Sequence, residues 1–538
     1  MPGQNRPAIV VDTPPTSNGD LHIGHLAGPF MAADVHARYL RARGREVVFS
    51  SGTDDSQTYV LASARRKAMP PEELCGRSWH QIKHTLERMG ISLDGFAPYD
   101  DRYRASVRTF VDDLYAAGKF ELRTVRLPYS ERTGEFLVEG LVAGYCPVCL
   151  VFSRGGLCET CGHPNNFDEL LDPQSTVDQH DPVTHRETEI LVLPLEQYRE
   201  RLVEFYERRK DRMRPHTVQV VRELLAKPLP DFPITYPIGW GIPAPFPETP
   251  DQRLNAWVEG IPAVMYCTAF ADEQKRGGPD GSADDELWRA ERDAEVIYFI
   301  GFDNVYFWGL THVALLMAHE GKYVLPDAIV SNEFYELEND KLSTSLGNVL
   351  YTNDLLDEVP RDLIRFYLAL TCPESQRANF SRAALDKVAD LRVVTPWNQL
   401  AEVVNKVTAA SGVTDELPVS QAAQARAGAV AARFRVCYEI DGYSLTRAAD
   451  LIVAQTERLL LAAQALDPSA AGTSSALADL FLELRTLISC AAPIMIDLAA
   501  SGAEAGGFTC RLDDEATRVS TVKPFRVPAI EAAAPSGA

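Results

Sequence analysis

Long apolar runs, leader segments and internal repeats are missing from this 538-residue sequence. No uncharged apolar run reaches the roughly 18 residues that a membrane-spanning helix needs, which argues against an integral membrane protein. The chain opens without the charged and then apolar segment of a signal peptide, so we expect no secretion. These absences predict a cytoplasmic protein without a membrane partner. The length alone predicts two to four domains.

Positive charge is also in short supply. The sequence has 53 Lys and Arg residues against 75 Asp and Glu residues, which gives a formal net charge of −22. Surfaces that bind nucleic-acid backbones are usually basic. The balance therefore disfavours a general phosphate-backbone binder, although it leaves room for a local basic groove.

Cysteine is sparse and unevenly placed. Two Cys-x-x-Cys units contain four of the ten cysteines, namely Cys146, Cys149, Cys158 and Cys161. We expect the other six to be reduced core residues, as is usual in a reducing compartment. Four thiolates in two tight pairs can enclose a tetrahedral zinc ion that has no open position, which would make the zinc structural. Two redox pairs or idle thiols are the alternative.

The chain is organised around residues 14–25. Before them, Ala8–Val11 is a short apolar run with two valines, which predicts a buried strand. After them, Leu26–Leu40 is apolar at helical spacing. The stretch is therefore the loop between a strand and a helix, which is where an open α/β sheet binds its ligands. The N-terminus of a helix suits a phosphate in particular.

Two histidines in this loop are candidates for phosphate chemistry. His22 and His25 are three residues apart, on one side of the first helical turn, and Gly24 between them lets a ligand approach the backbone. Two imidazoles can donate hydrogen bonds to a phosphate that gains charge in a transition state. For a lone His-x-x-His, two surface histidines near a helix start would be the better interpretation.

A second motif lies late in the chain, at 341–348. It has Lys341 followed by the small hydroxyl residues Ser343 and Ser345, a combination that can close over a triphosphate. Together the two motifs resemble the signatures of class I aminoacyl-tRNA synthetases, and the chain is most similar to the methionyl-tRNA synthetase family. Supporting matches follow the family's order at 52–54, 146–149, 240–243, 257–259 and 299–303.

The resemblance implies an α/β fold with several parts. These are a Rossmann-like (HUP-type) parallel-sheet catalytic domain in two halves, 1–117 and 236–355; an inserted connective domain with a zinc knuckle, 118–235; a linking stem, 356–394; a helix bundle, 395–500, like the family's anticodon-binding domain; and a partly disordered tail, 501–538. The apolar spacing of residues 395–500 independently predicts a helix bundle.

The resemblance also assigns roles to single residues and implies ATP, Mg²⁺ and zinc. Asp54 pairs with the α-ammonium group of an amino acid, although a turn aspartate after glycine is the alternative. Trp257 walls the amino-acid pocket, unless it is a core tryptophan. The other substrate-binding candidates are Thr13, Thr16 and Trp308. The nucleotide-binding candidates are Asn18, Gly24, Gly301, Asp303 and Thr344.

Three departures from the family fall on functional positions. Thr344 replaces the second lysine of the late signature, which weakens the contacts to the triphosphate. Thr16 replaces a tyrosine and Trp308 a histidine, changes that make methionine doubtful as the substrate. No tryptophan follows Trp397, although stacking on an anticodon base needs an aromatic face.

These departures predict an ATP-dependent ligase that forms an aminoacyl-adenylate and passes the aminoacyl group to a small amine, hydroxylamine or hydroxyl in specialised metabolism. The alternative is a genuine methionine–tRNA ligase. This alternative is favoured by Asp54, Trp257 and the zinc knuckle. An inactive binding protein of the same fold is the third hypothesis. The sequence indicates neither the amino acid nor the oligomeric state.

Overall fold

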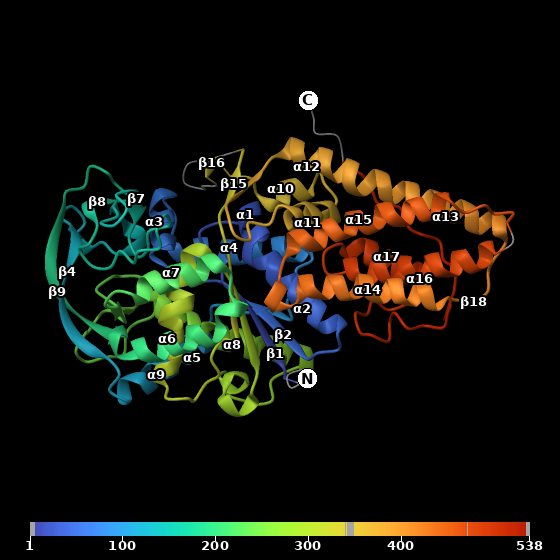
Figure 1. Cartoon of the computed structure of the whole chain (residues 1–538). Helices are drawn as coiled ribbons and strands as arrows, with labels where there is room; N and C mark the ends of the chain where they lie inside the picture. Colours follow the sequence, from blue (N-terminus) through green and yellow to red (C-terminus); the bar gives the residue numbers. More distant parts are fainter. Residues whose placement is uncertain (1–5, 339, 342–348, 471, 534–538) are drawn as a thin grey trace.

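The computed structural model describes residues 6–338, 340–341, 349–470 and 472–533. Figure 1 shows three regions side by side: an α/β region in the centre, a β-rich insertion at the left and a helix bundle at the right. The chain order of the elements shows that the insertion interrupts the central region, since its strands fall between β3 and β13.

The central region is built on a five-stranded parallel sheet. Its strands, in spatial order, are β14 (Ala328–Asn332), β13 (Glu295–Gly301), β1 (Ala8–Asp12), β2 (Val47–Ser51) and β3 (Gly95–Phe96). All pairings are parallel, with Val10 opposite both Ile297 and Phe49. The chain leaves β1 toward β2 on one side, whereas β13 pairs on the other. The strand order therefore reverses at β1, and a doubly wound sheet binds ligands at that reversal.

Each face of the sheet is covered by helices because the strands are apolar on both sides. Ala8 and Val10 lie in one buried cluster with Val35 of α2 (Met31–Ala42). Ile9 and Val11 lie in the other, with Val258 of α8 (Ala256–Arg276). The predicted strand at 8–11 is confirmed.

The remaining helices of this region and the stem surround the sheet. They are α1 (Ile23–His25), α3 (Thr58–Arg66), α4 (Pro71–Met89), α5 (Asp101–Ala116), α9 (His312–Ala318), α10 (Thr352–Leu356), α11 (Arg361–Leu370) and α12 (Arg382–Ala389). A small sheet of β15 (Tyr335–Leu337), β16 (Asp340–Lys341) and β17 (Ala378–Phe380) links the central region to the stem.

Two antiparallel sheets form the insertion. A long hairpin-like pair, β4 (Glu121–Ser130) and β9 (Val183–Pro194), carries β5 (Glu135–Phe136) and β10 (Asp231–Pro233) at its edges. The other sheet is β7 (Phe152–Arg154), β6 (Val142–Tyr145) and β8 (Leu171–Ser175), which holds both Cys-x-x-Cys units. Helices α6 (Arg199–Arg209) and α7 (Pro215–Leu225) follow, and β11 (Thr235–Tyr236) pairs with β12 (Arg253–Leu254).

The C-terminal region is a helix bundle, as predicted. Its helices are α13 (Thr395–Ser411), α14 (Gln421–Tyr438), α15 (Leu445–Gln464), α16 (Thr473–Ala491) and α17 (Ile496–Gly506), with the short pair β18 (Leu417–Pro418) and β19 (Thr521–Val522) beside them. The helical spacing of apolar residues over 476–498 predicts a single helix, and this prediction is wrong. Pro493 lacks an amide N–H and cannot continue a helix, so the chain turns there and α17 starts anew.

The tail does not behave as its composition predicts. The Gly-, Ala- and Ser-rich composition after residue 500 predicts disorder at 529–538, but Ile530 exchanges two hydrogen bonds with the side chain of Asn398 on α13. Val527 does the same with Asn405. Both apolar side chains are buried, which explains why this stretch is held; residues 534–538 lie outside the described part.

Among the described residues, none of the helices has the length and the apolar character that crossing a bilayer requires.

Candidate active site

The loop after β1 places both histidines of the first motif at the reversal of the sheet. The N–H of Gly24 donates to Nδ1 of His22 at 3.2 Å, and the N–H of His22 donates to Nδ1 of His25 at 3.3 Å. The two rings are in contact, with centroids 3.8 Å apart and planes tilted by 32°. Each imidazole is thereby tied to backbone N–H groups of the first helical turn.

These hydrogen bonds fix which ring nitrogen carries the proton. Burial lowers the pKa of His22 well below its usual range, and the neighbouring His25 lowers it further. Burial also lowers the pKa of His25 to about 4. Both rings are therefore neutral at pH 7. Because Nδ1 accepts in each ring, Nε2 bears the hydrogen and is the donor available to a phosphate.

The helix after the motif differs from the predicted one. Expected from Leu26, it already begins at Ile23, and residues 26–30 form a π-helical turn in which Gly28 has non-helical dihedral angles. Pro29 explains this irregularity, because it removes one hydrogen bond of the helical ladder. The regular helix α2 follows from Met31.

The chain that follows the late motif returns to this same loop. The N–H of Ile23 donates to the carbonyl oxygen of Leu350 at 3.2 Å, and the N–H of Thr352 donates to that of Leu21 at the same distance. At the other end of the motif, Lys341 pairs through its backbone with Glu336 of β15, a strand that lies against α1. The two motifs therefore flank one site.

Several predicted residues of the late motif fall outside the described part. Ser343, Thr344 and Ser345 belong to the segment 342–348, and the side chain of Lys341 is likewise not described. Their roles at the triphosphate stay predictions.

Asp54 follows β2 at the same edge of the sheet. Its N–H donates to the carbonyl oxygen of Pro15, and it bridges to Thr16, so the first loop and Asp54 are held together. Gln57 Nε2 donates to Asp54 Oδ2 at 2.8 Å, whereas Oδ1 is buried without a partner among the described residues. Burial raises the pKa of Asp54 to about 7, and Asp55 contributes in the same direction.

Gly301 and Asp303 lie at the end of β13, beside the loop after β1. A Cβ on Gly301 would come within 2.5 Å of Asp303 Oδ1, so a larger residue here would displace the carboxylate of Asp303. Asn304 Nδ2 donates to the same oxygen at 3.0 Å. The N–H of Thr13 donates to the carbonyl oxygen of Phe299 at 3.1 Å, which ties the two strand ends together.

Asn18 belongs to the loop itself. Its N–H donates to the carbonyl oxygen of Thr16, and its own carbonyl accepts from Lys67 Nζ at 2.9 Å. These bonds hold the loop in place and leave the predicted contact of Asn18 with the nucleotide a prediction.

The two predicted pocket tryptophans differ in their surroundings. Trp257 is half-buried and lies parallel to Phe307, with ring centroids 3.8 Å apart. Trp308 is only 2% exposed and packs edge-on against Tyr298 and His312. The partly open aromatic wall is therefore formed by Trp257 over Phe307, while Trp308 fills the space behind it.

Two buried carboxyl groups beside this wall were missed by sequence reasoning. Glu139, 6% exposed, comes from the insertion. Burial raises the pKa of its carboxyl group, and an interaction with the Trp257 side chain partly offsets that rise. Glu259 of α8, 1% exposed, is two residues after Trp257. Its Oε2 lies 3.4 Å from the hydroxyl of Tyr103. The matching stretch 257–259 was the only signal for Glu259; nothing local marks Glu139.

The four predicted zinc ligands converge. Their sulfur atoms all lie within 4.8 Å of one another, with Cys146 to Cys161 at 3.7 Å and Cys149 to Cys158 at 3.6 Å. A tetrahedral site with zinc–sulfur distances of about 2.3 Å has edges of about 3.8 Å. The cluster therefore fits a structural zinc ion, and redox pairing is not seen, since all ten cysteines are free.

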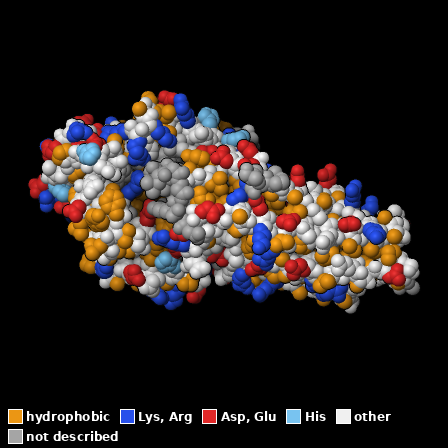
Figure 2. Space-filling view, turned by 90° about the horizontal axis from the view of Figure 1, so that it is seen from above, with side chains coloured by type: hydrophobic (Ala, Val, Ile, Leu, Met, Phe, Trp, Pro, Cys, Tyr) orange, Lys and Arg blue, Asp and Glu red, His pale blue; other side chains and the backbone are white. Residues whose placement is uncertain are grey.

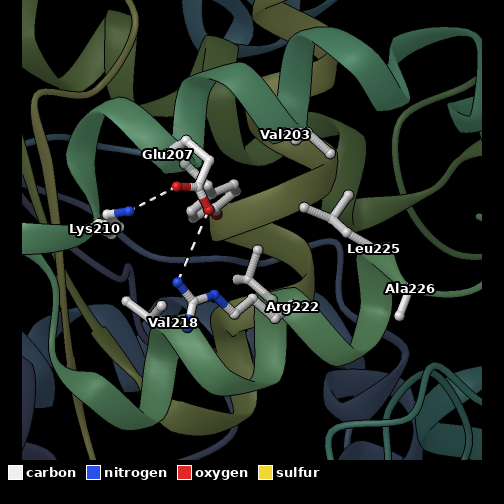
Figure 3. Close-up of a pocket in the computed structure, with 9 residues that line it drawn as sticks. Val203, Glu207, Lys210, Val218, Arg222, Leu225 and Ala226 are labelled. Carbon is white, nitrogen blue, oxygen red and sulfur yellow. Dashed lines mark hydrogen bonds and ion pairs between the residues drawn. The ribbon is translucent and has the colours of Figure 1, made fainter.

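A cleft between α6 and α7 contains none of the predicted site residues. It measures about 170 Å³ and is lined by Val203, Val218 and Leu225, with Glu207 between Lys210 and Arg222 (Figure 3). Its apolar walls and internally paired charges give it no groups for amino-acid or nucleotide chemistry.

Comparison with known proteins identifies the family of this chain and several relatives. A family model described as "tRNA synthetases class I (M)" matches residues 9–405. The methionine–tRNA ligase of Roseiflexus sp. (strain RS-1) is 33% identical, over 73% of this chain and 67% of that protein. The ligase of the same name from Porphyromonas gingivalis is 31% identical, over 71% of this chain and 55% of that protein. The match thus spans between about half and two thirds of these relatives.

A solved structure shares the fold. The Mycobacterium tuberculosis methionyl-tRNA synthetase in complex with methionyl-adenylate superposes with a TM-score of 0.74 and 21% identity, over 99% of both chains. The Rossmann-like core, the insertion and the bundle are therefore one known architecture, as the sequence predicted.

Proposed function

The chain belongs to the methionyl type of the class I tRNA synthetase family, and from this premise we propose that it activates an α-amino acid with ATP. A carboxylate oxygen of the amino acid attacks the α-phosphorus of ATP, pyrophosphate leaves, and an aminoacyl-adenylate remains. The aminoacyl group then passes to a hydroxyl of tRNA, and AMP leaves.

The described residues divide this work between them. The Nε2–H groups of His22 and His25 donate to phosphate oxygens, where neutral donors stabilise the charge that develops as pyrophosphate leaves. Asp54 holds the α-ammonium group through Oδ1, the carboxylate oxygen that has no partner among the described residues. Trp257 and Phe307 wall the amino-acid side chain. To these described residues we add Lys341, whose side chain lies outside the described part, as a positive charge at the triphosphate.

One observation supports the proposal above the others. The hydrogen bonds between residues 21–23 and 350–352 hold both flanks of the nucleotide signatures at the sheet's reversal, beside Asp54. A purely structural role would not require two signatures so distant in sequence to meet at the edge of the sheet where ligands bind.

ATP enters with Mg²⁺, and the four cysteines of the insertion fit a structural zinc ion. A cytoplasmic location stays a prediction, as does the division into domains at the boundaries given above.

The acceptor is best assigned by the relatives, which are named methionine–tRNA ligases. They favour tRNA over the small-molecule acceptor that the sequence pattern favoured. On the face shown in Figure 2, Lys and Arg side chains are interspersed with Asp and Glu, so contacts to a nucleic acid would rest on local groups.

A small-molecule acceptor remains the second candidate because of the bundle. Trp397, the last tryptophan of the sequence, is 2% exposed and donates its indole N–H to the carbonyl oxygen of Pro528. It therefore has no face to offer to an anticodon base. Asn398 and Asn405 of the same helix are occupied by the tail.

Amino-acid-dependent exchange of pyrophosphate into ATP tests the activation step. The wild-type protein is expected to exchange with at least one amino acid in a panel, and His22→Ala to lose most of that rate, while the exposed His80→Ala keeps it. No exchange with any amino acid contradicts the proposal. Charging of tRNA, against consumption of small amines and hydroxylamines, then decides the acceptor.

A further inference from the structure

The amino-acid pocket contains three buried carboxyl groups, whose raised pKa values keep them largely protonated until a cation pairs with them. Asp54, Glu139 and Glu259 lie close enough for the charge of Asp54 to raise the pKa of both glutamates, beyond the effect of their burial. Among the described residues, no basic side chain contributes to the pKa of Asp54 or of Glu139. Buried carboxylates in proteins are normally paired with a cation.

Within the described part of the chain, two of these carboxyl groups also lack a hydrogen-bond donor for one of their oxygen atoms. Oδ1 of Asp54 and Oε1 of Glu259 are both buried and have no donor among the described residues. Glu259 is 1% exposed, so solvent does not supply that donor. Buried acceptors without a donor are rare in folded proteins and indicate that a ligand completes them.

Glu139 is the group placed to touch such a ligand. The insertion carries it over the site, where its backbone packs so tightly against Gly155 that a Cβ on Gly155 would come within 3.0 Å of the Cα of Glu139. A Cβ on the next residue, Gly156, would lie 3.5 Å from Cγ of Glu139 and 3.8 Å from Cζ of Phe307. Glu139 therefore sits at the aromatic wall itself.

Glu259 lies on the Asp54 side of the pocket. Its partners are Tyr103 and Ser56, and Ser56 follows Asp54 by two residues. A ligand that lies along Trp257 and Phe307 reaches Glu139 first.

We propose that Glu139 is a specificity-determining residue that binds a second protonated nitrogen, beside the ammonium group held by Asp54. The inference rests on the proposed activation of an amino acid and names the chemistry of its substrate. The second nitrogen has two possible sources: the side chain of the activated amino acid, as in a diamino acid, or the amine of an acceptor molecule. The stacked pair Trp257 and Phe307 suits the methylene groups and the cation of either.

The first arm of the test compares lysine, ornithine and 2,4-diaminobutyrate with norleucine and methionine in pyrophosphate exchange. Norleucine is lysine without its side-chain amine, so the pair isolates the second nitrogen. If the side chain is the source, diamino acids exchange, and Glu139→Gln lowers their kcat/KM by about 30-fold or more, the cost of removing one partner of a buried charge pair. Glu187→Gln, at an exposed glutamate of β9, leaves it unchanged.

The second arm uses an amino acid that exchanges in the first arm and measures AMP release with lysine or norleucine as acceptor. The bound ε-ammonium group first gives one proton to the carboxylate of Glu139. The free amine then attacks the carbonyl carbon of the adenylate, the bond from that carbon to the phosphate oxygen breaks, AMP leaves, and the second proton of the nitrogen goes to solvent as the amide forms. If the acceptor is the source, lysine releases AMP faster than norleucine, and Glu139→Gln removes the difference.

Binding of lysine and norleucine by calorimetry separates this inference from the proposed function. Lysine binding that Glu139→Gln weakens, in a protein without exchange activity, would support the site and contradict the activation. Exchange with neutral amino acids alone, with equal AMP release and binding for lysine and norleucine in wild type and Glu139→Gln, would overturn the inference and leave the activation standing. Thermal unfolding of Glu139→Gln shows that the variant is folded.

Discussion

The backbone N–H of Ile23 donates to the carbonyl oxygen of Leu350, 3.2 Å away. Through this bond the helix that starts after the first signature is held against the chain that leaves the second. A rigid contact of this kind fixes where groups on both segments stand relative to one nucleotide, and correct placement accounts for a large share of the rate in reactions that join two substrates.

The histidine donors give the first prediction. His22→Ala or His25→Ala removes one Nε2–H at the phosphates and should lower the rate of pyrophosphate exchange by about 10²–10³-fold, the usual cost of losing one preorganised donor. The amino-acid KM should change little. The exposed His80→Ala on α4 is the control. Equal rates in all three variants would show that the imidazoles do not take part.

The same rings predict how stability varies with pH. Burial lowers the pKa of His25 to about 4, below the value of about 6.5 in an unfolded chain. The folded state then binds fewer protons than the unfolded state between these values. Stability is therefore full above about pH 6.5 and declines as the pH falls toward 4. Urea unfolding of wild type and His25→Asn at pH 7 and 5 measures it, and the variant should lose less on acidification.

The pKa of Asp54 is shifted in the opposite direction from that of His25, and it predicts how activity varies with pH. Burial raises its pKa to about 7, so the carboxylate form that pairs with an ammonium group is populated only as the pH rises through 7. We expect kcat/KM for the amino acid to increase over that range. Asp54→Asn should lower kcat/KM by about 30-fold or more at pH 8, and its residual activity should be flat with pH; Asp101→Asn, at a fully exposed position, should follow wild type.

The raised pKa also has a consequence for folding. Because the folded state holds a proton on Asp54 that the unfolded state has already released, this group stabilises the protein at low pH and ceases to do so as the pH rises through 7. Asp54→Asn should therefore be more stable than wild type at pH 8. A loss of stability there would contradict the assigned burial of the carboxylate.

The zinc knuckle is tested by its ligands. Cys146→Ser should reduce bound zinc from one ion per chain to near none, because a structural site needs all four thiolates. Cys510→Ser, at a half-buried cysteine of the tail region, should keep its zinc. Elemental analysis of the purified proteins measures both. Unchanged zinc content in Cys146→Ser would contradict the site.

Much of the site could be predicted because its signals are local. The strand at 8–11, the histidine pair and the four cysteines are each marked by residues within a few positions of one another, where periodicity and spacing act. Glu139 carries no such mark. It reaches the pocket only because the whole insertion folds back over Trp257, and no short window of sequence contains that contact.

The errors in the bundle have the same origin. Pro493 interrupts an apolar period that continues on both sides of it, so the period alone suggested one helix. The tail is poor in strong local signals, yet Val527 and Ile530 are buried against α13 and hydrogen-bonded to its asparagines. Tertiary contacts outweigh local composition in both cases.

The last prediction concerns the joint between the central region and the bundle. Arg365 of α11 donates to Asp34 of α2 at 2.6 Å, and both side chains are fully buried. Arg365 also donates to the carbonyl oxygens of Met89, Pro493 and Ile494, so one guanidinium ties together α2, the end of α4 and the turn before α17. Burial opposes the charge on Asp34, but Arg365 and Arg38 outweigh it and lower the pKa of that carboxyl.

Arg365→Met should lower the free energy of unfolding by about 3–5 kcal/mol, because it removes one of the two arginines that pair with the buried Asp34 and leaves three carbonyl oxygens without that donor. The matched control is Arg361→Met, one turn earlier on the same helix, which breaks a partly exposed pair with Asp497 and should cost about 1 kcal/mol or less. Urea unfolding at pH 7 measures both. Since Asp34→Asn removes the charge that Arg365→Met leaves paired with Arg38 alone, the double variant should lose less than the sum of the two single variants. Equal losses for Arg365→Met and Arg361→Met would show that the buried pair does not hold the two regions together.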